Sequence, residues 1–98
     1  MEQRRVVITG LGAVTPLGLT AEDSWQAVRR GVCGIGPITH YDASAQKVKL
    51  AAEVKDFVPE NYLGRPEAKR MARFTQFAVV AAQQLLKDSG LVINDDNA

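Results

Sequence analysis

The sequence offers two residues for nucleophilic chemistry, the single cysteine Cys33 and the single histidine His40. A catalytic thiolate needs a base within hydrogen-bond reach, and it often lies at a helix N-terminus that stabilises the negative charge. Cys33 instead follows the C-terminus of a predicted helix, the end that disfavours an anion. One cysteine and one histidine also make no metal-ligand cluster. We therefore predict no catalytic or metal-binding residue, and we interpret Cys33 as a small, half-buried loop residue and His40 as a hydrogen-bonded loop residue.

Gly10 and Gly12 follow a predicted strand, as the glycines of a dinucleotide-binding turn do. That fingerprint needs a third small residue three positions after the second glycine, and a helix that opens there. Thr15 and then Pro16 occupy that point, and the next helix begins only near Thr20. A nucleotide-binding α/β domain is therefore the weakest of three functional hypotheses, and no cofactor is predicted. We expect the two glycines to let the strand pass close to a neighbouring element.

A group of cations is the remaining candidate site. Arg65, Lys69, Arg70 and Arg73 lie within nine residues, opposed only by Glu67. On one continuous helix Lys69 and Arg73 would be neighbours four residues apart, with Arg70 beside them. Such a patch at a helix N-terminus costs helix stability, which favours the interpretation that it binds an acidic partner. An ordinary solvated charged face is the alternative, and these residues alone leave both interpretations open.

Two strands and two helices are predicted to position these residues. Consecutive β-branched residues at 6–8 are typical of a strand buried on both faces, which we place over residues 5–14. A weaker alternation predicts a second strand over residues 49–54, after a loop over residues 31–41. The parts predict an α/β fold, but two strands provide too little sheet to cover the helices. We infer that the chain is part of a larger fold or depends on a partner.

The first predicted helix begins after Thr20, a good N-cap, and ends before Gly31, a good C′ residue. Its apolar residues Trp25 and Val28 are three apart and are expected to face inward. The second helix is predicted over residues 69–89, where apolar residues at helical spacing widen into the broad stripe of an enclosed helix. Small residues on that stripe would let another backbone approach closely: Ala78, Ala81 and Ala82.

Composition places the chain among globular proteins, with 46% hydrophobic and 23% charged residues. The formal net charge of +1 gives no global field that would attract nucleic acid or a membrane surface. No apolar run reaches the roughly 18 residues of a membrane span. The apolar start is interrupted by glycines and a proline, unlike a signal peptide. We predict a cytoplasmic protein with neither nucleic acid nor membrane as a partner.

The sequence carries the strings RRVVITGLGAVTPLG, GVCGI, HYDAS, AAEVKDF and KRMARFTQFAVVAAQQLLKDSGL, with a Trp25-containing helix after the first. Together these segments resemble the amino terminus of β-ketoacyl-[acyl-carrier-protein] synthases. The VKDF segment points to the type II synthases of bacterial fatty-acid synthesis. We interpret residues 1–98 as the N-terminal part of the N-terminal domain of such a synthase, without a complete second domain.

The resemblance implies a thiolase-like fold with α-β-α-β-α layers, of which this chain would hold an incomplete part. It implies an acyltransferase that elongates fatty acids. An active-site cysteine accepts the acyl chain from a carrier protein, and malonyl-carrier protein then decarboxylates and attacks the thioester. The cysteine and the two histidines of the family lie beyond the length of this chain, so the 98 residues alone are predicted to be inactive. Full-length family members are homodimers.

The resemblance also implies a role for the cationic group. Family members dock the acidic face of the acyl carrier protein on basic residues at the start of the long helix, and Lys69 and Arg70 match that site. A third position, usually basic in close relatives, is Pro66 here, and Arg65 or Arg73 could compensate. The competing hypothesis is a non-catalytic small protein that binds carrier proteins or pairs with a longer synthase.

Overall fold

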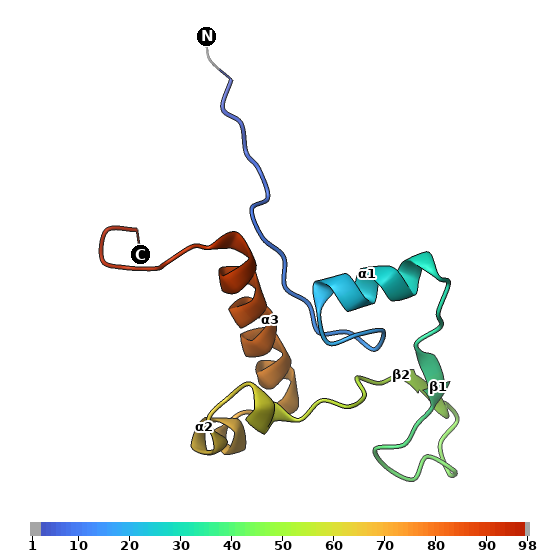
Figure 1. Cartoon of the computed structure of the whole chain (residues 1–98). Coiled ribbons are helices and arrows are strands. Elements are labelled where there is room, and N and C mark those ends of the chain that lie inside the picture. The colour runs from blue at the N-terminus through green and yellow to red at the C-terminus, as the bar shows by residue number, and fades with distance from the viewer. Residues whose placement is uncertain (1–2, 98) are drawn as a thin grey trace.

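The computed structural model describes residues 3–97 and contains helices near both ends of the chain with a small hairpin between them (Figure 1). The elements are α1 (Ala21–Arg29), β1 (Ile35–Pro37), β2 (Leu50–Ala52), the 3-10 helix η1 (Pro59–Asn61), α2 (Arg65–Arg70) and α3 (Arg73–Ser89). Helix α3 lies beside the segment that leads into α1, and the hairpin extends from the far end of α1.

Helix α1 has the two ends that its sequence predicts. The Thr20 hydroxyl accepts a hydrogen bond from the Asp23 backbone N–H at 3.0 Å, which satisfies one of the free donors of the first turn. At the other end Gly31 has φ +70° and donates to the Val28 carbonyl, and Val32 donates to the Ala27 carbonyl. These two bonds make a Schellman motif, whose left-handed residue is most readily a glycine.

The inward face predicted for α1 is wrong. Trp25 and Val28 keep 57% and 54% of their surface exposed, and the buried residue of the helix is Ala27. A helix turns its apolar stripe toward whatever covers it, and within residues 3–97 nothing covers this stripe.

The single helix predicted over residues 69–89 is also wrong, because the chain breaks it in two. Met71 and Ala72 have ψ values of 138° and 156°, which are extended and not helical. Helix α2 therefore ends at Arg70, and the 17-residue α3 begins at Arg73. Residues Lys69 and Arg73, expected to be neighbours one turn apart, belong to different helices. The end of α3 was predicted correctly, since Gly90 follows it with φ +70°.

A short antiparallel pair joins β1 to β2, with Ile35 opposite Ala52 and Pro37 opposite Leu50. The predicted strand over residues 49–54 is confirmed in its centre. Its partner β1 lies within residues 31–41, which we predicted to be a loop. Gly34 precedes β1, and Gly36 and Pro37 are two of its three residues, a composition that conceals a strand this short.

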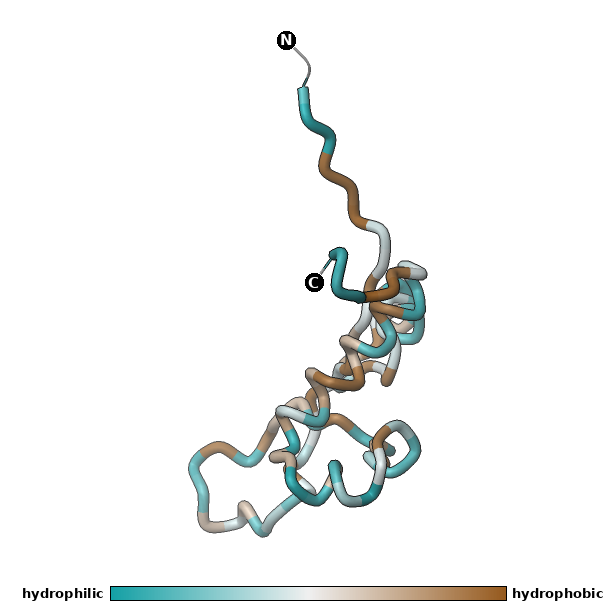
Figure 2. Tube along the Cα trace, turned by 90° about the vertical axis from the view of Figure 1, so that its left-hand side faces the viewer, coloured by the Kyte–Doolittle hydropathy of each residue, from teal (hydrophilic) through white to brown (hydrophobic). Residues whose placement is uncertain are grey.

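The predicted strand over residues 5–14 is extended but unpaired. Residues 3–9 make no backbone ladder within the described chain, and Val6 and Ile8 are 95% and 82% exposed. Figure 2 shows this apolar segment projecting from the body of the molecule. From Gly10 onward the segment lies against α3, where a Cβ on Gly12 would overlap the Ala81 carbonyl oxygen. The predicted close passage at Gly10 and Gly12, beside a small helix residue, is confirmed.

The chain buries little of its apolar surface. Its accessible area is 8114 Å², whereas about 5500 Å² is expected for a compact protein of this mass. Its radius of gyration is 17.4 Å, against about 13 Å for a compact domain of this length. The buried apolar residues among 3–97 are Ala27, Ala43, Phe57, Ala68 and Val80. The elements therefore leave apolar faces uncovered, in line with the predicted shortage of sheet.

Candidate functional site

Cys33 and His40 are not brought together. Cys33 is exposed, contrary to the predicted partial burial, and its Sγ lies 3.9 Å from the Ile35 carbonyl oxygen as a weak hydrogen bond. His40 is a hydrogen-bonded loop residue, as predicted, and its backbone N–H donates to Glu53 at 3.2 Å. Its ring Nε2 lies 3.5 Å from the same carboxylate. Within residues 3–97 no group of His, Cys, Asp and Glu side chains could hold a metal ion.

Glu53 is the centre of this small network. Its carboxylate accepts from the backbone and the hydroxyl of Thr39 at 2.9–3.2 Å, as well as from His40. Desolvation alone would raise the pKa of Glu53, but the hydrogen bonds from Thr39 and His40 outweigh it and hold the pKa below its ordinary value of 4.5. The ionised carboxylate thereby ties the residue after β2 to the two residues Thr39 and His40 that follow β1.

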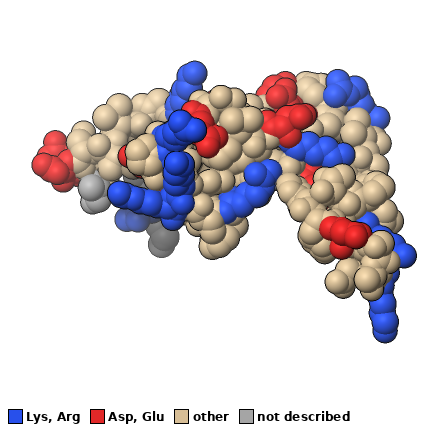
Figure 3. Space-filling model, turned by 90° about the horizontal axis from the view of Figure 1, so that it is seen from below, with Lys and Arg blue, Asp and Glu red and all other residues tan. Residues whose placement is uncertain are grey.

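Three of the four residues of the cationic group lie on α2, and their side chains are exposed. Arg65 is the first residue of α2, and Lys69 and Arg70 are in its last turn. All three are exposed, and no ion pair holds them within the described chain. Figure 3 shows Lys and Arg side chains gathered over the region of α2 on the face seen from below. These residues form a positive surface that can meet a complementary acidic one.

The stability argument made for this group from the sequence is wrong. Lys69 and Arg70 lie at a helix C-terminus, where cations interact favourably with the helix dipole. Their charge therefore does not lower the stability of α2, and so the stability argument gives no indication of a binding partner. Arg65 and Arg73 are the first residues of α2 and α3, and a cation at a helix N-terminus costs roughly 0.3–1 kcal/mol.

Arg73 has local contacts that offset this cost. Its Cζ lies 5.1 Å from the centroid of the Phe77 ring and 5.5 Å from that of Phe57. An exposed cation–π contact contributes about 0.5–1 kcal/mol, so two of them balance the dipole. Its Nη2 also donates to the Val54 carbonyl at 3.2 Å. Arg73 is thus placed apart from Lys69 and Arg70, and its guanidinium is held by its own neighbours.

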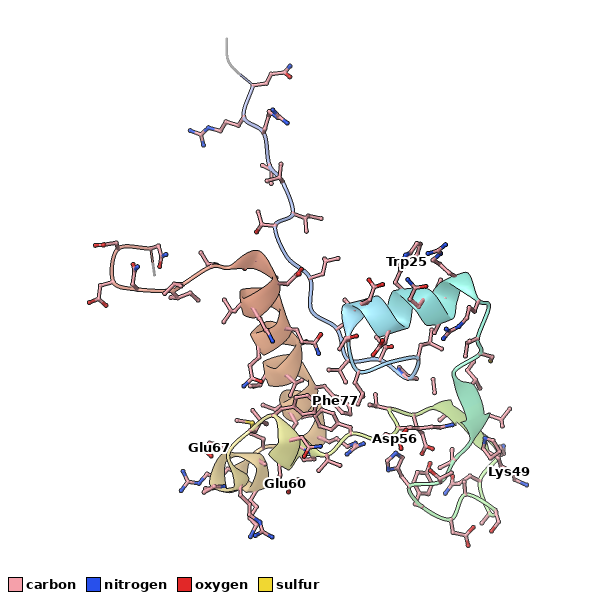
Figure 4. All side chains as sticks on the ribbon, viewed as in Figure 1. Trp25, Lys49, Asp56, Glu60, Glu67 and Phe77 are labelled. Atoms are coloured by element: carbon pink, nitrogen blue, oxygen red, sulfur yellow. The ribbon has the colours of Figure 1, made fainter. Side chains whose placement is uncertain are left out.

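Two further residues shape the α2–α3 corner (residues 68–76), and sequence reasoning missed both. Gln76 is buried, and its amide donates to the Ala68 carbonyl at 2.9 Å, which closes the C-terminal end of α2. Phe57 is 7% exposed, and its ring meets Phe77 edge-on at 5.0 Å. Figure 4 shows Phe77 at the junction between α3 and the segment before α2. Gln76 is itself a polar residue on the apolar stripe of α3, and this was the one signal that the sequence offered.

Helix α3 also forms hydrogen bonds with the amino-terminal segment. Asp88 accepts from the Leu11 N–H at 2.9 Å, and Gln84 accepts from the Ala13 N–H at 3.1 Å. The Gln84 amide also donates to the Leu19 carbonyl at 2.6 Å. Polar side chains of α3 therefore satisfy backbone groups that a neighbouring strand would otherwise pair. These bonds hold the amino-terminal segment against α3.

Residues 3–97 form a segment of α/β structure. Its candidate site is the group of exposed cations on helix α2, and no set of catalytic side chains is assembled among these residues. Comparison with known families makes this specific. The family described as "Beta-ketoacyl synthase, N-terminal domain" matches residues 3–98. The chain belongs to the β-ketoacyl synthase family, and it matches the N-terminal region of that family.

Similar proteins agree with this assignment. The 3-oxoacyl-[acyl-carrier-protein] synthase 2 of Synechocystis is 55% identical over 98 residues, all of this chain and 24% of the relative. The protein of the same name from Coxiella burnetii is 50% identical, with the same coverage of both chains. This chain therefore spans about a quarter of the length of the curated relatives that it matches.

Solved structures give the fold. The ishigamide ketosynthase/chain length factor superposes with a TM-score of 0.81 at 35% identity, over 93% of this chain and 23% of the other. A β-ketoacyl synthase from Burkholderia phymatum superposes with a TM-score of 0.71 at 28% identity, over 95% and 23%. The expected α/β fold is thereby confirmed as an N-terminal part of the thiolase-like ketosynthase fold.

Proposed function

We propose that this chain serves in a 3-oxoacyl-[acyl-carrier-protein] synthase that elongates fatty acids. The reaction is the decarboxylative Claisen condensation of malonyl-carrier protein with an acyl-enzyme thioester. Support comes from the family match over residues 3–98 and from relatives of that name at 50–55% identity. The chain matches only a quarter of their length, so the activity is proposed for the intact synthase, as a homodimer in the cytoplasm.

Within the 98 residues we propose no catalytic activity. The only thiol, Cys33, is exposed in a loop, and its nearest described polar contact is a carbonyl oxygen and not a base. The only histidine, His40, is engaged by Glu53. Neither residue matches the family's catalytic cysteine or histidines. The prediction is that the isolated chain, incubated with acyl- and malonyl-carrier protein, forms neither an acyl-enzyme nor a β-ketoacyl product.

The function that we assign to these residues is docking of the acyl carrier protein through its acidic face. The observation that carries this proposal is the exposure of three cations on the six-residue helix α2, Arg65, Lys69 and Arg70, without a partner among residues 3–97. Pro66 departs from the basic residue usual at that position, and Arg65 beside it supplies a replacement charge. Exposed charges of this kind steer encounter and fix orientation more than they add affinity.

A charge reversal on α2 tests the docking proposal. Lys69→Glu with Arg70→Glu should weaken binding of purified acyl carrier protein by about tenfold or more and flatten its dependence on salt. The matched control is Lys47→Glu with Lys49→Glu, which changes the net charge equally on the exposed hairpin. Lys49 lies on the hairpin side of the molecule, away from Glu67 on α2 (Figure 4). Unchanged affinity in the α2 variant would contradict the proposal.

The second candidate function is a free-standing, non-catalytic protein that binds carrier proteins or pairs with a longer synthase. The favouring observation is that the docking cations lie wholly within these residues. The intact mass of the natural protein separates the two candidates. A mass near 10.6 kDa would favour the second, and a mass near four times larger would favour the synthase.

A further inference from the structure

Arg73 differs from the other three members of the cationic group because its guanidinium is engaged at three points. The ring centroids of Phe57 and Phe77 lie 5.5 Å and 5.1 Å from its Cζ. Its Nη2 donates to the Val54 carbonyl oxygen at 3.2 Å. The two rings meet edge-on, with an interplanar angle of 75°, so the planar guanidinium bridges two aromatic surfaces. These contacts join the first turn of α3 to the segment that precedes α2.

The backbone at Asp56 brings two of the three contacts together. Asp56 has φ +60°, the left-handed region that aspartate adopts more readily than most residues. Val54 and Phe57 flank this turn, so the Val54 carbonyl and the Phe57 ring face the same guanidinium. Phe57 is buried, which fixes its ring as a surface for Arg73. Figure 4 places Asp56 and Phe77 at neighbouring points of this junction.

We propose that Arg73 is a positioning residue that fixes the direction of α2 relative to α3, and with it the placement of Lys69 and Arg70. The proposal rests on the docking function proposed for those two residues. Helix α2 has six residues and ends in extended backbone, so its own hydrogen bonds do not set its direction. Gln76 holds the end of α2 through the Ala68 carbonyl, and Arg73 holds the segment that enters it.

The alternative role for Arg73 is direct contact with the acidic partner. The two roles need different properties of the side chain. Contact with an acidic surface needs the positive charge, which lysine retains. Bridging two rings and a carbonyl needs the planar guanidinium, which lysine lacks. The substitution Arg73→Lys therefore separates positioning from docking, while Arg73→Ala removes both.

The experiment compares Arg73→Lys and Arg73→Ala in the intact natural protein, with Arg29→Lys on the exposed last turn of α1 as the matched control. Purified acyl carrier protein is titrated, and amide hydrogen exchange is measured at Met71 and Gln76, whose N–H groups donate within the α2–α3 corner. Both Arg73 variants should weaken carrier binding about fivefold and accelerate exchange at these amides by a similar factor, since neither lysine nor alanine can contact both rings and the Val54 carbonyl at once. The control should change neither quantity.

Wild-type affinity in Arg73→Lys together with a loss in Arg73→Ala would overturn the proposal and make Arg73 a docking charge. Wild-type exchange in both variants would overturn it as well, because the corner would then not depend on Arg73. The docking function is tested separately by the charge reversal at Lys69 and Arg70. If that reversal leaves binding unchanged while Arg73→Lys loosens the corner, the docking function fails and the structural role of Arg73 stands.

Discussion

The amino-terminal stretch up to the start of α1 divides into two regions, residues 3–9 and residues 10–20, that differ in what lies beside them. In residues 3–9 the β-branched side chains are exposed, with Val6 at 95%, and no described residue pairs with the backbone. In residues 10–20 the chain lies against α3 and is largely half-buried. There Gln84 and Asp88 bind backbone groups at 2.6–3.1 Å.

The difference teaches that the residue types of a segment favour its backbone conformation, whereas its burial depends on a neighbouring surface. The β-branched run at residues 6–8 favours extended backbone by itself. Burial requires a second surface, and α3 provides one only as far as Gly10. Each of the following predictions tests this distinction, beginning with the largest expected effect.

The largest effect is expected where backbone meets backbone. A side chain at Gly12 would overlap the Ala81 carbonyl oxygen and lie 2.9 Å from the Leu85 nitrogen. Because neither helix atom can move alone, Gly12→Val should cost about 3 kcal/mol or more and separate the segment from α3. Thermal unfolding and hydrogen exchange at the Ala13 amide measure the two effects. Gly36→Ala is the control, since its Cβ meets nothing within 4 Å and its φ is ordinary; an equal loss there would contradict the steric account.

The next largest effect is expected at Gln84, whose side-chain amide accepts one backbone hydrogen bond and donates another. Gln84→Met keeps the length of the side chain but leaves the Ala13 N–H and the Leu19 carbonyl without their partner. A loss of about 2 kcal/mol follows, since these groups are partly buried. Denaturant unfolding measures it, with Gln83→Met on the exposed side of the same helix as the control. If both variants unfold alike, the α3 side chains do not hold the segment.

A smaller effect is expected at the hairpin, where Glu53 plays the same part as Gln84 but carries a charge. Its folded pKa lies below the ordinary 4.5, so its contribution is complete above that pH and is lost as pH falls through the folded pKa. Protection of the Thr39 and His40 amides from exchange, measured relative to the intrinsic exchange rate at each pH, should therefore fall in that acidic range. Glu53→Gln should remove this pH dependence. An identical acid response in the variant would show that another group titrates.

The smallest effect is expected in the uncovered region. Val7→Thr preserves the β-branched shape, and the Val7 side chain is 65% exposed, so the free energy of unfolding of the 98-residue chain should change by less than about 0.5 kcal/mol. The same substitution in a longer protein that covers this segment should cost more, because a hydroxyl would then be buried. Equal values in the two contexts would show that the segment remains uncovered.

Local features of the fold could be predicted from the sequence because their causes lie within a few residues. Thr20 and Gly31 determine the ends of α1 through bonds that span three to five positions. The glycines at 10 and 12 and the small Ala81 correctly indicated a close approach. The family resemblance depended on such residues, and it is confirmed over residues 3–98.

Features with causes distant in sequence could not be predicted. Neither glycine nor proline occurs at Met71 or Ala72, and both residues favour helix, so the break between α2 and α3 has no local signal. It coincides with the contacts of Arg73 and Gln76, which become visible only in three dimensions. The cations of the candidate site could be identified from the sequence. Their place at a helix C-terminus could not, because it depends on that break.

The bonds from α3 to the amino-terminal segment also have a consequence for synthesis. Leu11 is separated from Asp88 by 77 residues, and Ala13 from Gln84 by 71. At ribosomal rates of about 5–20 residues per second, the segment waits roughly 4–15 s before the helix that holds it exists. During that time the backbone N–H groups of Leu11 and Ala13 lack the partners that α3 provides. The backbone at Leu11 and Ala13 is therefore held only after α3 has been made, long after these residues themselves.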